Sequence, residues 1–153
     1  MDESAVIEAA GAELEGMRMV RLRIPARAEY IALARLALSG LADIVSIPEE
    51  LVADLKLALT EAVSNSVRHA YGGGDGFVSV AYQLSGGALA VEVVDDGEGF
   101  DPERPPALEG EELTEGGLGI AIIRTIADDF QLDSRPGVRG SRLRFVKRLR
   151  PPV

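Results

Sequence analysis

Two apolar-rich segments near the middle of the chain place the strongest constraint on its fold. They cover residues 77–84 and 88–94 and are separated only by Ser85, Gly86 and Gly87. Valine and aromatic residues predict strands here, and so short a connection with two glycines predicts a tight hairpin. Because a hairpin joins antiparallel neighbours, we expect a sheet in which antiparallel pairs predominate.

The segment before this hairpin predicts one strand and two helices. Residues 17–24 alternate apolar and basic side chains, which is the pattern of a half-buried strand. Residues 28–41 have apolar side chains at helical spacing and predict a helix that stops near Gly40. A longer helix is predicted to begin near Pro48 and to end at about Tyr71, because proline favours the first turn and three glycines follow.

The segment after the hairpin predicts a loop, a helix and two more strands. Residues 100–115 contain three prolines and little periodicity, which predicts a long mobile loop. A helix opened by glycines is predicted over residues 116–129, and strands over 130–134 and 141–149. The whole order predicts an α+β fold, a two-layer α/β sandwich whose mixed, mostly antiparallel sheet has helices on one face.

Length and composition indicate a single domain over residues 17–150. A chain of 153 residues, 46% of them hydrophobic, can bury a core, and it has no internal repeats. Residues 1–16 are acidic and alanine-rich and predict a short helix or a frayed, flexible N-terminal extension. No targeting segment or membrane-spanning run is recognisable, so we expect a cytoplasmic protein that does not bind a membrane.

Cysteine, histidine and charge exclude several kinds of chemistry. The chain has no cysteine, which removes disulfides, thiolate catalysis and zinc clusters. The single histidine, His69, cannot form a two-histidine metal site within one chain. The net charge of −9 argues against non-specific nucleic-acid binding. Neither lysine follows a glycine-rich phosphate loop, so a nucleotide would have to be bound by another scheme.

The first of three chemically suggestive segments lies on the long predicted helix. Glu61, Asn65 and His69 are spaced by four residues, and Arg68 follows Glu61 by seven, so their side chains share a stripe beside the apolar one. A carboxylate, a carboxamide and a basic group in one row are unusual for a purely structural surface. The alternative is an ordinary solvated helix face, and this segment alone leaves both open.

The second segment directly follows the predicted strand 88–94. Asp95, Gly97 and Gly99 form an Asp-x-Gly-x-Gly sequence. Glycines at this place let the backbone turn sharply or approach a ligand closely, and the aspartate can accept a hydrogen bond from an exocyclic amine such as adenine N6. A simple strand-ending turn is the alternative.

The third segment lies where the predicted loop becomes a helix. Gly117 and Gly119 flank Leu118, and the free N–H groups of a first helical turn, together with the helix dipole, favour an anion. A flexible loop end is the alternative. Taken in chain order, the three segments predict one pocket for a base, a metal-bound phosphate and an oxygen nucleophile.

As a set, these segments resemble the motifs of the GHKL (Bergerat-fold) ATPase superfamily, and most closely its small anti-sigma-factor serine kinases. The resemblance covers about residues 20–149. The similar segments are Glu61 to Tyr71 (the N box), Asp95 to Gly99 (the first glycine box), Gly117 to Gly119 (the second glycine box) and Gly140 to Leu143 (the final box). That family often has threonine where this chain has Ser141.

The resemblance implies a role for each matching residue. Glu61 would be the general base for the attacking hydroxyl, Asn65 would bind Mg²⁺, and Asp95 would accept a hydrogen bond from adenine N6. The residues implied to bind ATP are Asn65, Arg68, His69, Asp95, Gly97, Gly99, Gly117, Leu118, Gly119 and Ser141. For Arg68 and His69 two roles stay open, steadying phosphate charge or steadying the Glu61 carboxylate.

The function implied by the resemblance is an ATP-dependent serine kinase that acts as an anti-sigma switch. It would phosphorylate a small anti-anti-sigma (STAS-type) protein and sequester a sigma factor as a homodimer, without binding nucleic acid directly. A histidine kinase would need a phosphoacceptor histidine on a separate helical domain, whereas the only histidine here is His69, inside the N box. The alternatives are a nucleotide-binding sequestering module without significant kinase activity and an α/β domain with accidental glycines.

Overall fold

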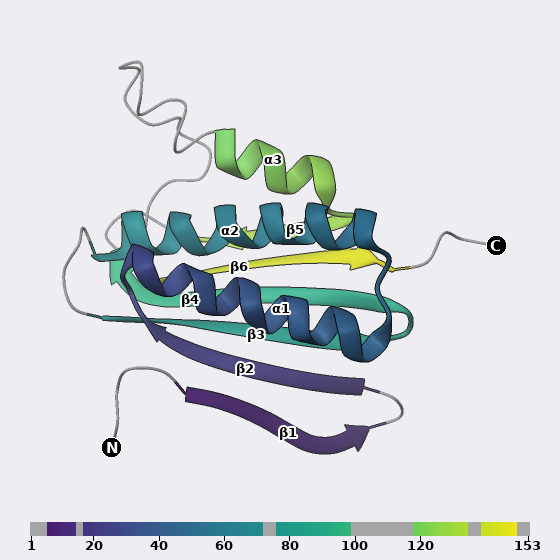
Figure 1. Cartoon of the computed structure of the whole chain (residues 1–153). Coiled ribbons are helices and arrows are strands. Elements are labelled where there is room, and N and C mark those ends of the chain that lie inside the picture. The colour runs from purple at the N-terminus through teal and green to yellow at the C-terminus, as the bar shows by residue number, and fades with distance from the viewer. Residues whose placement is uncertain (1–5, 15–16, 72–75, 99–117, 135–138, 150–153) are drawn as a thin grey trace.

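The computed structural model of the chain describes residues 6–14, 17–71, 76–98, 118–134 and 139–149. Figure 1 shows two layers, a twisted sheet and a group of helices on one of its faces. The sheet has six strands in the order β1-β2-β3-β4-β6-β5. The strands are β1 (Val6–Leu14), β2 (Met17–Pro25), β3 (Phe77–Ser85), β4 (Ala88–Glu98), β5 (Asp129–Asp133) and β6 (Arg139–Arg148).

The central hairpin forms where the sequence predicts it. β3 and β4 are antiparallel and paired up to Ser85 and Ala88, so only two residues form the turn between them. Those residues, Gly86 and Gly87, have φ angles of 59° and 79°. A turn with two successive positive φ values matches the twist of the flanking strands and favours glycine at both positions, which explains the Gly-Gly pair.

The helical layer consists of a short 3₁₀ turn and three α-helices. They are η1 (Ala28–Tyr30), α1 (Ile31–Val45), α2 (Glu49–Tyr71) and α3 (Leu118–Ile126). In Figure 1, α1 and α2 lie along the same face of the sheet, and α3 lies beside α2. In the part of the chain that the structure describes, no helix is long and apolar enough to cross a membrane.

The predicted α+β sandwich with helices on one face is confirmed, with one refinement of the sheet. Every strand pair among the described residues is antiparallel, whereas the sequence predicts a mixed sheet. The reason lies in the connection from β4 through α3 to β5. β4 and β5 run in the same direction, but β6 lies between them and is antiparallel to each.

Several elements differ from the sequence predictions, and strand β4 continues to Glu98, four residues past its predicted end. Val6–Leu14 is strand β1, paired antiparallel with β2, so the prediction of a short helix there is wrong. Helix α1 continues past Gly40 to Val45 and ends at Ser46, which takes the left-handed conformation with φ 58°. Helix α3 ends at Ile126, three residues earlier than predicted. The loop predicted over residues 100–115 lies outside the described residues.

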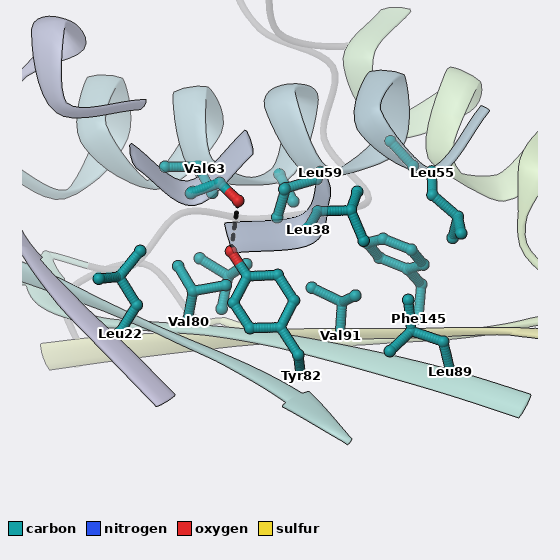
Figure 2. Packing of buried hydrophobic residues seen from close by; sticks show 14 of the residues in the cluster. Leu22, Leu38, Leu55, Leu59, Val63, Val80, Tyr82, Leu89, Val91 and Phe145 are labelled. Atoms are coloured by element: carbon teal, nitrogen blue, oxygen red, sulfur yellow. Dashed lines mark hydrogen bonds between the residues drawn. The ribbon is translucent and has the colours of Figure 1, made fainter. Parts of the chain in front are cut away.

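The core lies between the sheet and the helices. Alternate residues of β3 and β4 point into it, and Figure 2 shows Val80, Tyr82, Leu89 and Val91 rising towards the helices. Tyr82 is fully buried, and its hydroxyl donates a hydrogen bond of 2.7 Å to the backbone carbonyl of Ala34 on α1. This bond satisfies the one polar atom of a large core side chain and links the two layers.

Candidate functional site

Helix α2 places Glu61 and Asn65 one turn apart on the same side. Its core-facing residues include Leu59, Ala62 and Val63, all with no exposed surface. Asn65 is adjacent to this buried stripe and is only 5% exposed, whereas Glu61 is half-buried. A carboxamide kept out of water needs hydrogen-bond or metal partners, which makes Asn65 the most unusual polar residue of this helix.

The other two candidate residues of α2, Arg68 and His69, have less clearly defined side-chain positions. Arg68 is exposed. His69 belongs to α2, but its side chain lies outside the described residues. The structure therefore leaves both roles proposed for these residues open.

Asp95 and Ser141 form the clearest pair of predicted site residues. They are direct cross-strand partners on β4 and β6, and the Ser141 hydroxyl donates a hydrogen bond of 2.5 Å to Oδ2 of Asp95. Asp95 is only 6% exposed. Because a buried carboxylate is costly unless hydrogen-bonded, Ser141 helps to hold a polar group at the end of an otherwise apolar row of β4.

Gly140, directly before Ser141, has a backbone conformation that favours glycine and lies close to the backbone of Asp95. Gly140 has a φ of 92°, which L side chains rarely adopt, and a Cβ atom there would lie 3.5 Å from the backbone oxygen of Asp95. The ladder between β4 and β6 is also irregular between Asp95 and Glu98. Gly140 is not among the binding residues predicted from the sequence. Its position directly before Ser141, in the final box, is the sequence signal that could have identified it.

Helix α3 brings a second element next to Glu61. Gly119, the second residue of α3, is buried, and a Cβ atom placed on it would lie 2.6 Å from Oε1 of Glu61. The predicted second glycine box and the predicted general base are therefore adjacent in space, although 58 residues separate them in sequence. Leu118, just before Gly119, is 51% exposed.

The other predicted glycines are described only in part or not at all. Gly97 lies within β4, where the structure defines its backbone. Gly99 and Gly117 lie outside the described residues. The structure thus brings Asp95 together with Ser141, and Glu61 together with Gly119. Phosphate binding by Gly117 and Gly119 stays a prediction.

The one-sided sandwich and these paired residues are those expected of the superfamily that the sequence segments resemble. Comparison with family models agrees, since the model described as a histidine kinase-like ATPase domain matches residues 24–147. The chain belongs to this family. The superfamily resemblance drawn from the three sequence segments is therefore confirmed.

Similar proteins point to one branch of the family. The chain is 40% identical over 128 residues to the serine-protein kinase RsbW of Listeria innocua, covering 78% of this chain and 82% of that protein. It is 33% identical over 147 residues to the serine-protein kinase RsbW of Bacillus pumilus, covering 89% and 91%.

A solved structure supports the same fold. The RsbU and RsbW domains of Rv1364c from Mycobacterium tuberculosis match with a TM-score of 0.63 and 22% identity over 87% of this chain. The match spans only 33% of that longer chain. At this identity the likeness concerns the fold alone.

Proposed function

We propose that this chain is an ATP-dependent serine kinase that phosphorylates a small anti-anti-sigma protein of the STAS type and sequesters a sigma factor. The contact of Glu61, on α2, with Gly119, in the first turn of α3, supports this function most directly. The Glu61 carboxylate lies against the first turn of α3, where N–H groups are available for phosphate oxygens. The similarity to proteins named serine-protein kinase RsbW supports the choice of a serine acceptor.

The adenine end of the proposed site is built by β4 and β6. Asp95 would accept a hydrogen bond from the exocyclic amine of adenine, and the hydrogen bond from Ser141 orients its carboxylate. Gly97 and Gly99 would let the chain pass close to the base. A buried carboxylate that is held in place can select an amine-bearing base, because an analogue without the amine would leave a buried acceptor unpaired.

The metal end is proposed at Asn65. Mg²⁺ prefers oxygen ligands and keeps several waters and phosphate oxygens, so one amide oxygen from the protein suffices. Among the described residues no group of three or more histidine, cysteine, aspartate or glutamate side chains could hold a metal ion. When bound there, Mg²⁺ would neutralise phosphate charge.

Glu61 is proposed to act on the attacking hydroxyl. The serine oxygen of the partner forms a bond to the γ-phosphorus of ATP, the bond from that phosphorus to the β–γ bridging oxygen breaks, and the hydroxyl proton passes to the Glu61 carboxylate. The products are ADP and a phosphoserine. Gly117, Leu118 and Gly119 would hold the phosphates through backbone N–H groups, with Arg68 and His69 beside them.

The partner surface is proposed on the outer side of α1. Leu33, Leu36 and Ile44 are 37%, 65% and 70% exposed, while the opposite side of the helix is buried in the core. Exposed apolar side chains at helical spacing along one face are typical of protein-binding surfaces. We assign this face to the sigma factor, and a homodimer would present two copies of it.

A nucleotide-binding sequestering module without significant kinase activity is the second candidate. It shares the fold, the Asp95–Ser141 pair and the α1 surface with the first. Glu61 favours the kinase, because a protein that only binds has no need of a carboxylate beside the phosphate-binding turn.

Incubation of the protein with γ-labelled ATP and a STAS-type partner separates the two candidates. We expect label on one serine of the partner, none when that serine is replaced by alanine, and transfer slowed about 10²- to 10⁴-fold to a measurable residual rate in the Glu61→Gln variant, which keeps ATP binding. Absence of transfer by the wild type, with sigma-factor binding intact, would favour the sequestering module. Transfer at the wild-type rate by Glu61→Gln would show that Glu61 is not the base.

A further inference from the structure

Gly40 and Gly119 both lie in helices, but the space around these two glycines differs. Gly40, in α1, is exposed, and a Cβ atom added to it would have no atom of another element within 4 Å. Gly119, in α3, is buried, and its added Cβ atom would lie 2.6 Å from Oε1, 3.6 Å from Cδ and 3.8 Å from Cβ of Glu61. Only at Gly119 does the missing side chain make room for another residue.

The distance at Gly119 is too short for any real Cβ atom. Carbon and oxygen atoms that are not bonded to each other pack at about 3.0 Å or more, with an optimum near 3.5 Å. An alanine at this position would therefore require a shift. Because the nearest atom is the far end of a rotatable side chain rather than backbone, the carboxylate would move and the helices would stay in place.

Glycine inside a helix has a cost that this contact explains. It destabilises a helix relative to alanine. Helix α3 has only nine residues, so the cost falls on a short element. Glycine at position 119 lowers helix stability but leaves the space that the Glu61 carboxylate occupies, as is typical of functional sites.

We propose that Gly119 is a positioning residue for the Glu61 carboxylate: the absence of a Cβ atom on α3 allows Oε1 to lie against the first turn of that helix. The inference rests on the proposed role of Glu61 as general base. It differs from a role in phosphate binding, because alanine keeps the backbone N–H at position 119 and changes only the space that Glu61 occupies.

Kinetics of the Gly119→Ala variant test this role. We expect kcat to fall about 10- to 100-fold, since displacing a catalytic group by about 1 Å has effects of this size. KM for ATP should change less than about twofold, because the N–H group remains. In the Glu61→Gln background the same substitution should change kcat little, because the group that it displaces no longer accepts a proton. Thr125→Ala is the control, at an exposed residue of α3 whose hydroxyl donates a hydrogen bond to the Ala121 carbonyl of the same helix.

Two kinetic results would overturn the inference. One is a rise in KM for ATP without a fall in kcat, which would assign Gly119 to phosphate clearance. The other is an equal loss of kcat in the wild-type and Glu61→Gln backgrounds, which would show that the effect does not pass through the carboxylate.

A spectroscopic measurement keeps the inference separate from the kinase proposal. With ¹³C-labelled glutamate, the Cδ resonance of Glu61 is assigned by its loss in Glu61→Gln. We expect this resonance to shift in Gly119→Ala and not in Thr125→Ala. An unchanged resonance in folded Gly119→Ala would overturn the positioning role. A shifted resonance in a protein that transfers no phosphate would support the positioning role and contradict the proposed function instead.

Discussion

Asp95 is the residue whose placement is hardest to explain by folding alone. It continues the core-facing row of β4, in which Leu89, Val91 and Val93 have no exposed surface, and it is itself only 6% exposed. Burying a carboxylate costs several kcal/mol unless hydrogen bonds compensate. A leucine or valine there would pack at lower cost, and we therefore propose that the hydrogen-bonded Asp95–Ser141 pair serves ligand binding.

The chemical groups of the proposed site are easier to predict from the sequence than their contacts. Glu61, Asn65 and Asp95 were recognisable because their residue types and spacing are unusual for a helix face or a strand end. The contact between Glu61 and Gly119 was not predictable, since it depends on how α3 packs against α2. Gly140 was missed as well, because a positive φ inside a strand ladder has no periodic signature.

Tyr82 provides a prediction about the core at this scale. Replacing it by phenylalanine removes the hydrogen bond to the Ala34 carbonyl and leaves the ring packing intact. We expect Tyr82→Phe to lower the free energy of unfolding by about 1 kcal/mol at pH 7. Urea unfolding measures the change, and a variant as stable as the wild type would contradict a contribution from this bond.

The same residue predicts a loss of stability in alkaline solution. Burial raises the pKa of the Tyr82 phenol far above its usual value near 10. The folded state therefore holds this proton where the unfolded state releases it. The associated stability is fully present below pH 10 and falls above it by up to about 1.4 kcal/mol per pH unit. Urea titrations between pH 8 and 11 should show a shallower decline for Tyr82→Phe, and equal declines would contradict the assignment.

At the scale of elements, the C-terminal end of α1 shows that core packing can override the tendency of a glycine to end a helix. The sequence predicts that the helix stops near Gly40, yet it continues to Val45 and ends at Ser46 in a left-handed conformation. Leu41 and Ala42, just after the glycine, are 7% exposed and pack into the core. Burial of these side chains outweighs the weak helix propensity of one glycine.

Gly40 gives a second prediction. The Gly40→Ala variant should raise the free energy of unfolding by about 0.5–1 kcal/mol, because alanine restricts the unfolded chain and its methyl group has open space in α1. Thermal or urea unfolding of the purified protein measures the gain. A destabilised variant would mean that α1 does not have the conformation described.

In strand β1, tertiary pairing also overrides a local preference, in this case a preference for helix. Residues 6–14 are rich in alanine and glutamate, which favour helices. They nevertheless pair with β2, whose outer edge would otherwise present unpaired N–H and C=O groups. A neighbouring strand edge is a tertiary feature, so the pattern of residues 1–16 alone could not reveal it.

At the scale of the whole molecule, the layering was predictable and the strand order was not. The alternation in residues 17–24 and the two-glycine hairpin indicated a largely antiparallel sheet, and the amphipathic helices indicated one covered face. Placement of β6 between β4 and β5 was beyond the sequence, because it depends on the path through α3. That placement matters for the site, since it puts Ser141 beside Asp95.

We propose that α2, α3, β4 and β6 together form one Mg²⁺-dependent ATP site. Titration calorimetry of ATP with and without Mg²⁺, on the wild type and on Asn65→Ala, tests it most directly. Circular dichroism establishes that both proteins are folded. The wild type should bind ATP more tightly when Mg²⁺ is present, and Asn65→Ala should lose at least about tenfold of that affinity, or about 1.4 kcal/mol. Equal affinity of the two proteins, or a wild type that does not bind ATP, would contradict the claim.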